Sequence, residues 1–196
     1  DQEAQRMSMN FAREQSLHMV PSYHRLLVAG VATYWVELLR AVRDLQTVYV
    51  PIGLGSGISA MLAARAALGT TTEVVGVVSA HARAYLESFT QGKAIDCPVT
   101  TRIADGMACR SPNAEALEVI LHGVDRIVEV TDAEVAHAMR TLFECTHNVS
   151  EGAGAAPLAA ALQEKHRNRG RKIAVTVSGG NIDTELFASV LTGSFP

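Results

Sequence analysis

The chain of 196 residues is long enough for one sizeable hydrophobic core with a small appended segment. Its 48% hydrophobic and 19% charged residues are typical of a soluble globular α/β protein. The net charge of −3 does not favour nucleic-acid binding, and no basic run or long apolar stretch indicates a membrane partner. The three cysteines, Cys97, Cys109 and Cys145, lack a metal-binding spacing and suit a reducing cytoplasm.

The hydrophobic pattern predicts helices that alternate with strands. The expected helices cover residues 3–16, 25–44, 58–69, 82–92, 113–123, 132–146, 151–167 and the end of segment 172–191. The expected strands cover residues 47–52, 73–79, 125–130 and the beginning of segment 172–191. Gly69 is expected to end the third helix and Thr131 to cap the sixth, whereas residues 94–112 are predicted to form a long loop. This alternation predicts an α/β fold with a mostly parallel, twisted sheet covered by helices on both faces.

A glycine-rich segment, PIGLGSG (51–57), stands between an expected buried strand and an expected helix. Backbone N–H groups at a helix N-terminus are unpaired and lie at the positive end of the helix dipole, so they attract phosphate. Glycines let the backbone come close to phosphate oxygens because no Cβ stands in the way. The spacing alone fits a phosphate-binding loop and a tight turn without a ligand about equally well.

Two familiar nucleotide motifs do not fit this loop. The dinucleotide pattern G-x-G-x-x-G matches Gly53 and Gly55 but has Ile58 in place of the third glycine. The next strand ends in Val78 and Ser79, so it lacks the acidic residue that would bind a ribose. The loop also lacks the Gly-Lys-Ser/Thr ending of a P-loop. We therefore do not expect it to bind NAD or ATP.

A second loop of small residues, Ser178-Gly179-Gly180-Asn181, follows the last expected strand. Loops at the carboxyl ends of parallel strands share one edge of the sheet, where ligands bind. Ser178 is therefore expected to reach the same crevice as Gly53–Gly57, although this short sequence also fits a bare turn. The segment EGAGAAPLAA (151–160) enters a helix through two glycines and would add a third loop of this type.

In chain order, the segments VPIGLGSG (50–57), IADGMA (103–108), EGAGAAPLAA (151–160) and VSGGNID (177–183) resemble the C-terminal two-thirds of the serine/threonine dehydratases. These are pyridoxal-phosphate enzymes of the tryptophan-synthase-β-like fold. The resemblance covers essentially all 196 residues. It implies that residues 1–22 are a remnant of the small domain and the crossover. Residues 23–196 would then be the C-terminal portion of an incomplete large domain, with the phosphate loop.

The resemblance also implies roles for particular residues. The phosphate of pyridoxal phosphate would be wrapped by Gly53, Leu54, Gly55, Ser56 and Gly57, and the Ser178 hydroxyl would meet the pyridine nitrogen. Leu54 and Ser56 depart from the family's run of four glycines, so Leu54 must point away, while Ser56 adds a hydroxyl. A neutral hydroxyl does not hold a proton on the ring nitrogen, which favours β-elimination over a long-lived carbanion.

Further positions follow from the same resemblance. Glu151 is expected near the cofactor ring, although a carboxylate at a helix N-terminus is also explained by the helix dipole. Asp105 and Gly106 are expected to line the same pocket or to form a plain turn. The divalent-cation site of some relatives is not expected, because Val78 and Ala84 replace its Glu and Asp ligands.

The family's Schiff-base lysine segment, S-F-K-x-R-G, and its ring-contacting segment, S-x-G-N-H, do not occur in the sequence. The three lysines, Lys93, Lys165 and Lys172, are expected at the surface or at strand edges. We therefore interpret the sequence as the C-terminal part of a dehydratase that is inactive alone and needs the missing N-terminal portion.

The implied function is the pyridoxal-phosphate-dependent dehydration and deamination of threonine or serine to a 2-oxo acid and ammonia. The expected setting is a cytoplasmic homo-oligomer with a small amino-acid substrate and no nucleic-acid or membrane partner. A catabolic enzyme is favoured because only fifteen residues follow Asn181. The alternatives are a dehydratase of hydroxyectoine breakdown and a non-catalytic phosphate-binding remnant, whereas Val78 and Ala84 disfavour a racemase or a threo-hydroxyaspartate enzyme.

Overall fold

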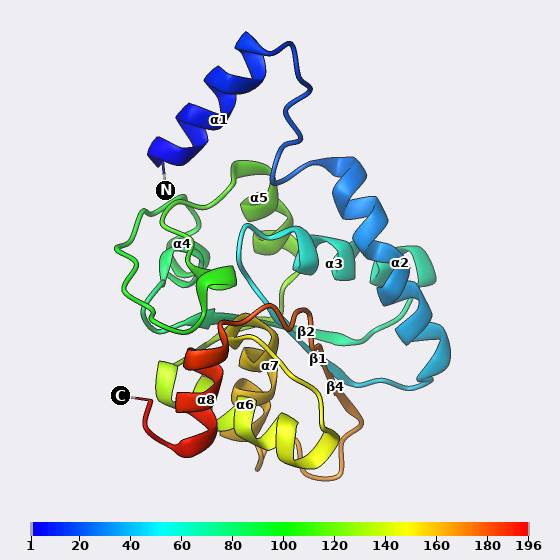
Figure 1. The fold of residues 1–196 in the computed structure, drawn as a ribbon. Helices are drawn as coiled ribbons and strands as arrows, with labels where there is room; N and C mark the ends of the chain where they lie inside the picture. Colours follow the sequence, from blue (N-terminus) through cyan, green and yellow to red (C-terminus); the bar gives the residue numbers. More distant parts are fainter. Residues whose placement is uncertain (1, 196) are drawn as a thin grey trace.

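The computed structural model describes residues 2–195 as a parallel sheet with helices on both faces (Figure 1). The strands are β1 (Thr47–Pro51), β2 (Glu73–Ser79), β3 (Arg126–Val130) and β4 (Ile173–Val175), in the order β3-β2-β1-β4. The helices are α1 (Gln2–Glu14), α2 (Arg25–Ala41), α3 (Ser56–Leu68), α4 (Ala84–Gln91), α5 (Ala114–Gly123), α6 (Asp132–Thr146), α7 (Gly152–Gln163) and α8 (Thr184–Thr192), with a short 3-10 helix, η1 (Asp105–Met107). The predicted α/β class and parallel sheet are confirmed.

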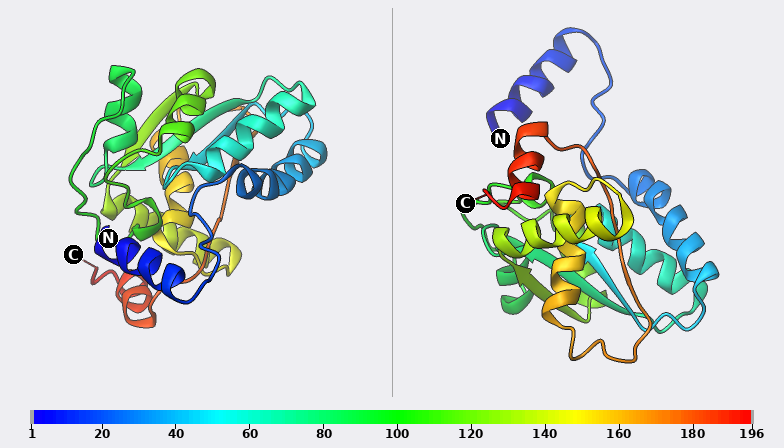
Figure 2. Two further views of the ribbon diagram at one scale, coloured as in Figure 1. Left: turned by 90° about the horizontal axis from the view of Figure 1, so that it is seen from above. Right: turned by 60° about the horizontal axis from the view of Figure 1, so that its bottom comes forward.

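Alternate side chains of the strands point to opposite faces of the sheet and build two cores. Val48 and Val50 pack with α2, α3 and α5 on one face, whereas Tyr49, Val75 and Val77 pack with α6 and α7 on the other. The two helix layers lie on either side of the sheet in Figures 1 and 2. Because both faces are covered, β1 and β2 are nearly continuous apolar runs.

The structure differs from the sequence-based elements mainly at their ends. Gly69 ends α3 with a φ of 62°, and Thr131 forms a capping box with Glu134, as predicted. However, α3 begins at Ser56, two residues earlier than the pattern indicated, so the helix includes the end of the glycine loop. In addition, α7 ends at Gln163, four residues before the predicted end at residue 167.

The first helix stands apart from the sheet and its covering helices (Figure 1). The side chains of Met7, Met9 and Phe11 in α1 are exposed. The predicted division between residues 1–22 and 23–196 falls just before α2 and stays a prediction.

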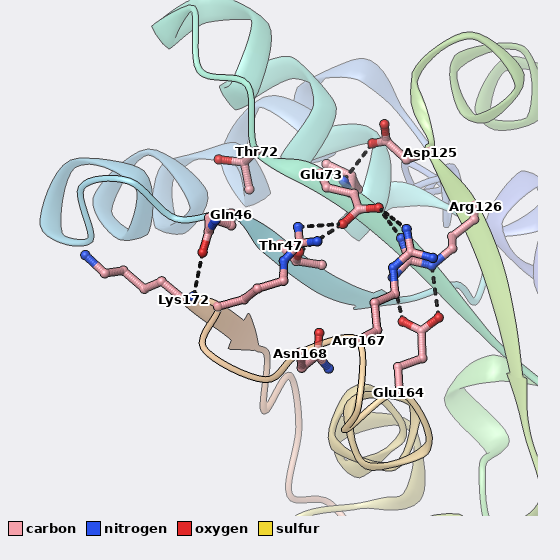
Figure 3. Close-up of polar contacts among 12 residues, drawn as sticks. Gln46, Thr47, Thr72, Glu73, Asp125, Arg126, Glu164, Arg167, Asn168 and Lys172 are labelled. Carbon is pink, nitrogen blue, oxygen red and sulfur yellow. Dashed lines mark hydrogen bonds and ion pairs between the residues drawn. The ribbon is translucent and has the colours of Figure 1, made fainter.

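At the amino ends of the strands, a network of ion pairs joins four parts of the chain (Figure 3). Glu73 at the start of β2 accepts hydrogen bonds from Arg126 at the start of β3 and from Arg167 and Arg171 in the turns before β4. Arg126 also donates to Glu164 at the end of α7. We call these five residues the amino-edge network; it ties α7 and the turns before β4 to the first residues of β2 and β3.

Burial and pairing have opposite effects on the carboxyl groups of this network. Burial raises the pKa of Glu73, but the hydrogen bond from Thr47 and the charges of the three arginines outweigh it, so the pKa is lowered. Burial likewise acts against the hydrogen bonds that Glu164 accepts from Arg126 and Tyr49, and the pKa of Glu164 is again lowered. Both glutamates are therefore ionised at neutral pH.

Candidate cofactor site

The glycine loop and Ser178 leave the sheet at the same edge. Gly53–Gly57 connects β1 to α3, and Ser178 follows β4. Strands β1 and β4 are parallel neighbours, with Thr47 opposite Ile173 and Tyr49 opposite Val175. Because both segments come directly after these strands, the structure places them together at the carboxyl edge, as the parallel topology predicted.

The backbone N–H groups of Gly53–Gly57 have no hydrogen-bond acceptor among the described residues. Within residues 2–195, none of these five amides donates a hydrogen bond to another residue. Gly55 is the N-cap of α3 and provides no side-chain cap, while Ser56 and Gly57 form the first turn. Unpaired donors at the positive end of a helix dipole form a binding site for an anion such as phosphate.

Two positions in this loop require glycine for reasons within the protein. Gly55 has a φ of 98°, and an added Cβ would lie 2.6 Å from the Cβ of Ala116 and 3.2 Å from the Tyr85 hydroxyl. A Cβ on Gly53 would overlap the carbonyl oxygen of Gly106. The sequence interpretation offered phosphate approach or a tight turn as the reason for these glycines, and the structure adds close packing against Ala116, Tyr85 and Gly106.

Close backbone contacts join the four segments on which the resemblance depends. The contact of Gly53 described above brings the first two segments together. A Cβ on Gly152 would overlap the carbonyl oxygen of Ile103, and one on Gly154 would lie 2.7 Å from the carbonyl oxygen of Gly179. Segments far apart in the sequence therefore meet at one place, which explains why small residues recur in all of them.

A cavity of about 210 Å³ adjoins this meeting point, and Asp105, Gly106, Glu151 and Asn181 are among the residues that line it. Asp105 and Gly106 thus line a pocket together with Glu151, and their place in a pocket shared with the glycine loop stays a prediction. Glu151 is the N-cap of α7, and its amide donates to the carbonyl oxygen of Gly179 at 3.0 Å. Both explanations offered for Glu151, a place beside a ligand and a helix-dipole position, agree with this geometry.

The remaining predicted residues lie beside the cavity rather than in its lining. The cavity lining does not include Gly53–Gly57 or Ser178. Ser178 is exposed, and the side chain of Leu54 is 41% exposed. Cofactor contacts by the loop and by Ser178 therefore stay predictions.

Two residues in contact with the loop were missed by sequence reasoning. Trp35 in α2 donates its Nε1–H to the carbonyl oxygen of Gly57 at 3.0 Å. Tyr85 in α4 donates its hydroxyl to the carbonyl oxygen of Leu54 at 2.8 Å, and burial raises its pKa. The one available signal was that Trp35 is the only tryptophan of the chain, since a buried indole N–H needs an acceptor.

None of the three lysines lies in the loops directly after the strands or lines the cavity. Lys93 follows α4 and Lys165 follows α7, and both are exposed. Lys172 precedes β4 at the amino edge, where its Nζ donates to the carbonyl oxygen of Arg43.

At the position of the metal site in some relatives, Val78 and Ala84 are buried alkyl side chains. In the described part of the chain, no three or more His, Cys, Asp or Glu residues are grouped to hold a metal ion. Over the same residues, every helix is too short or too polar to cross a bilayer.

The model of the family described as "Pyridoxal-phosphate dependent enzyme" matches residues 1–179. The chain belongs to this family. It is 32% identical over 184 residues to "L-threonine dehydratase catabolic TdcB" of Staphylococcus aureus, which covers 92% of this chain and 53% of the relative. It is 34% identical over 176 residues to "L-threonine ammonia-lyase" of Geobacter sulfurreducens, covering 90% and 44%. The chain thus spans about half the length of these curated relatives.

Solved structures of the family show the same fold. A threonine deaminase of T.th. is 33% identical with a TM-score of 0.72, covering 80% of this chain and 58% of that one. Maize serine racemase is 27% identical with a TM-score of 0.85, covering 97% and 59%. The predicted likeness to serine/threonine dehydratases, the tryptophan-synthase-β-like fold and the family's cofactor, pyridoxal phosphate, are confirmed.

Proposed function

We propose that this chain is the phosphate-binding part of a pyridoxal-phosphate-dependent lyase that converts L-threonine or L-serine to a 2-oxo acid and ammonia. The observation that carries the proposal is the row of free amides at Gly53–Gly57, on the same sheet edge as Ser178. The substrate class is supported by the names of the curated relatives, an L-threonine dehydratase and an L-threonine ammonia-lyase.

The residues at this edge fit the cofactor. The amides of Gly53–Gly57 would bind its phosphate, and no acidic side chain in the loop opposes that charge. When bound, pyridoxal phosphate would supply an electron sink for the carbanion formed at the α-carbon of the amino acid. The neutral Ser178 hydroxyl would meet the ring nitrogen without holding a proton on it, and Glu151 would lie near the ring.

The chemistry also requires a lysine that bonds to the cofactor, and among the described residues no lysine lines the cavity or lies in the loops directly after the strands. We therefore infer that the chain acts together with a portion that carries the S-F-K-x-R-G segment, and that the 196 residues alone have no lyase activity. A cytoplasmic, catabolic homo-oligomer remains part of the proposal; the free thiols of Cys97, Cys109 and Cys145 suit that compartment.

The test has two steps. Calorimetric titration of the chain should show that pyridoxal phosphate binds at least about tenfold more tightly than pyridoxal, because the loop contacts only the phosphate ester. The reading frame before Asp1 is then searched for the lysine segment, and the protein that contains it is assayed for ammonia release from L-threonine and L-serine. Equal affinity for the two compounds would refute the phosphate site. Phosphate-dependent binding without ammonia release would favour the non-catalytic alternative.

A further inference from the structure

Two buried aromatic side chains hold the glycine loop from behind. Trp35 is fully buried in α2, and Tyr85 is 1% exposed in α4. Both belong to the core on the α2 and α3 face of the sheet. Each donates its single polar hydrogen to a loop carbonyl, Trp35 to Gly57 and Tyr85 to Leu54. The loop is therefore attached to the core through its carbonyl groups, while its amides have no partner among the described residues.

Because the peptide bond is planar, the hydrogen bonds to the loop carbonyls also determine where the neighbouring amides point. In a trans peptide, the C=O of one residue and the N–H of the next point in opposite directions. All described peptide bonds are trans. The hydrogen bond from Tyr85 to the Leu54 carbonyl therefore directs the Gly55 N–H away from Tyr85. In the same way, the bond from Trp35 to the Gly57 carbonyl directs the Ile58 N–H away from Trp35.

The hydrogen-bonding direction of the Tyr85 hydroxyl is itself determined by a second contact. The backbone N–H of Asn113 donates to the hydroxyl oxygen at 3.1 Å, so the hydroxyl must use its own proton on Leu54. Asn113 in turn caps α5, because its Oδ1 accepts a hydrogen bond from the Ala116 N–H at 3.1 Å. One phenol thus connects α4, the loop and the start of α5, and Gly55 lets it approach.

We propose that Tyr85 and Trp35 are positioning residues of the phosphate site. By holding the opposite carbonyls, they orient the amide of Gly55 in the loop and the amide of Ile58 in the first turn of α3 toward the ligand. This inference rests on the proposed function. A purely structural role for these side chains would lower stability without a selective loss of phosphate affinity. The difference between those two outcomes makes the proposal testable.

The test compares two Tyr→Phe variants of the 196-residue chain. Tyr85→Phe removes the hydroxyl behind the loop. Tyr49→Phe removes the hydroxyl of a second buried tyrosine, which donates to Glu164 at 2.6 Å at the other edge of the sheet. Dissociation constants for pyridoxine phosphate, which cannot react with lysine, and for pyridoxine are measured by calorimetry, and Tm by calorimetric scanning. Tyr85→Phe is expected to weaken binding of the phosphate ester about five- to tenfold, the loss of one hydrogen bond, and to leave pyridoxine binding unchanged.

Tyr49→Phe is expected to lower Tm without changing the affinity for pyridoxine phosphate. Equal affinities of wild type and Tyr85→Phe would overturn the inference and leave the proposed function intact. A wild-type chain that does not bind pyridoxine phosphate would overturn the proposed function and the inference with it. If Tyr85→Phe does not fold, Trp35→Phe, which removes the other hydrogen bond and keeps a ring, decides between the same outcomes.

Discussion

At the amino edge of the sheet, Glu73 and Glu164 both pair with Arg126, whereas at the carboxyl edge the amides of Gly53–Gly57 have no partner within residues 2–195. Both edges belong to the same four strands. The amino edge joins its elements through ion pairs, whereas the carboxyl edge holds together through close glycine contacts and keeps its loop amides available. Groups left unsatisfied by the fold are the ones that a ligand can satisfy.

The comparison also shows why charge alone does not locate an anion site in this protein. The amino edge has the arginines, but Glu73 and Glu164 accept hydrogen bonds from Arg126, Arg167 and Arg171. The carboxyl edge has no cation in its loop, yet its free amides and helix dipole favour a phosphate. The two edges differ in whether their hydrogen-bond donors already have acceptors within the protein.

The largest expected effect comes from filling the glycine loop. Gly55→Ala combines a φ of 98° with a Cβ 2.6 Å from that of Ala116, so we expect about 3 kcal/mol of destabilisation and a more than tenfold loss of pyridoxine phosphate affinity. Gly170→Ala at the amino edge is the matched control, because its φ is 74° but its surroundings are open. It should cost about 1 kcal/mol in urea unfolding and leave affinity unchanged. A loss of affinity in both variants would contradict the comparison.

The second-largest effect is expected from a substitution that breaks the amino-edge network. Arg126→Met leaves Glu73 and Glu164 without their shared partner and should lower the free energy of unfolding by about 3 kcal/mol. Arg25→Met removes an exposed ion pair with Glu115 at 3.8 Å and should change it by less than about 0.5 kcal/mol. Neither variant should alter the affinity for pyridoxine phosphate in calorimetry. Weaker binding by Arg126→Met would contradict the comparison, because it would place the anion site at the amino edge.

Acid should weaken the amino edge before it affects the loop. The pKa values of Glu73 and Glu164 in the folded chain lie below the ordinary value of 4.5. Their stabilisation is therefore complete above the unfolded pKa and is lost as pH falls through the lowered folded values. Urea unfolding between about pH 6 and about pH 3 should show this decline, and Arg126→Met should show a shallower one. Parallel pH profiles of the two proteins would contradict the role of the network.

The smallest effect concerns Ser178. Its side chain is exposed, so Ser178→Ala should change the free energy of unfolding by less than about 0.5 kcal/mol. If the hydroxyl meets the ring nitrogen, this variant should weaken pyridoxine phosphate binding about two- to threefold, and Ser178→Asp should keep the bound ring protonated to higher pH. Ultraviolet titration of the bound compound measures this protonation. Unchanged spectra in Ser178→Asp would remove Ser178 from the site.

Much of the fold was predictable because its signals are local. Apolar runs marked the strands, and the caps at Gly69 and Thr131 depend on a few neighbouring residues. The predicted end of α7 was wrong because the helix-forming residues after Gln163 continue the helical pattern of the sequence. In the structure Glu164 instead turns toward Arg126, a contact across 38 positions that the local pattern does not contain.

The candidate site likewise has a part that the sequence predicted and a part that only the structure shows. Its loops were predictable because glycine-rich turns after parallel strands share an edge. The contacts of Trp35 and Tyr85 with the loop were not, because they join residues 22 and 31 positions apart. A buried aromatic residue in an amphipathic helix has the same pattern as an ordinary core residue, and only the structure shows its polar atom on a loop carbonyl.

The central claim is that the loop amides, and not the arginines of the amino edge, bind the phosphate ester. Amide proton–nitrogen NMR of the labelled chain during titration with pyridoxine phosphate tests it directly, with pyridoxine as the control. The account predicts shifts of the Gly53, Gly55 and Gly57 signals with the ester alone, and none at Arg167 or Arg171. Shifts at Arg167 and Arg171, with the loop signals unmoved, would contradict it.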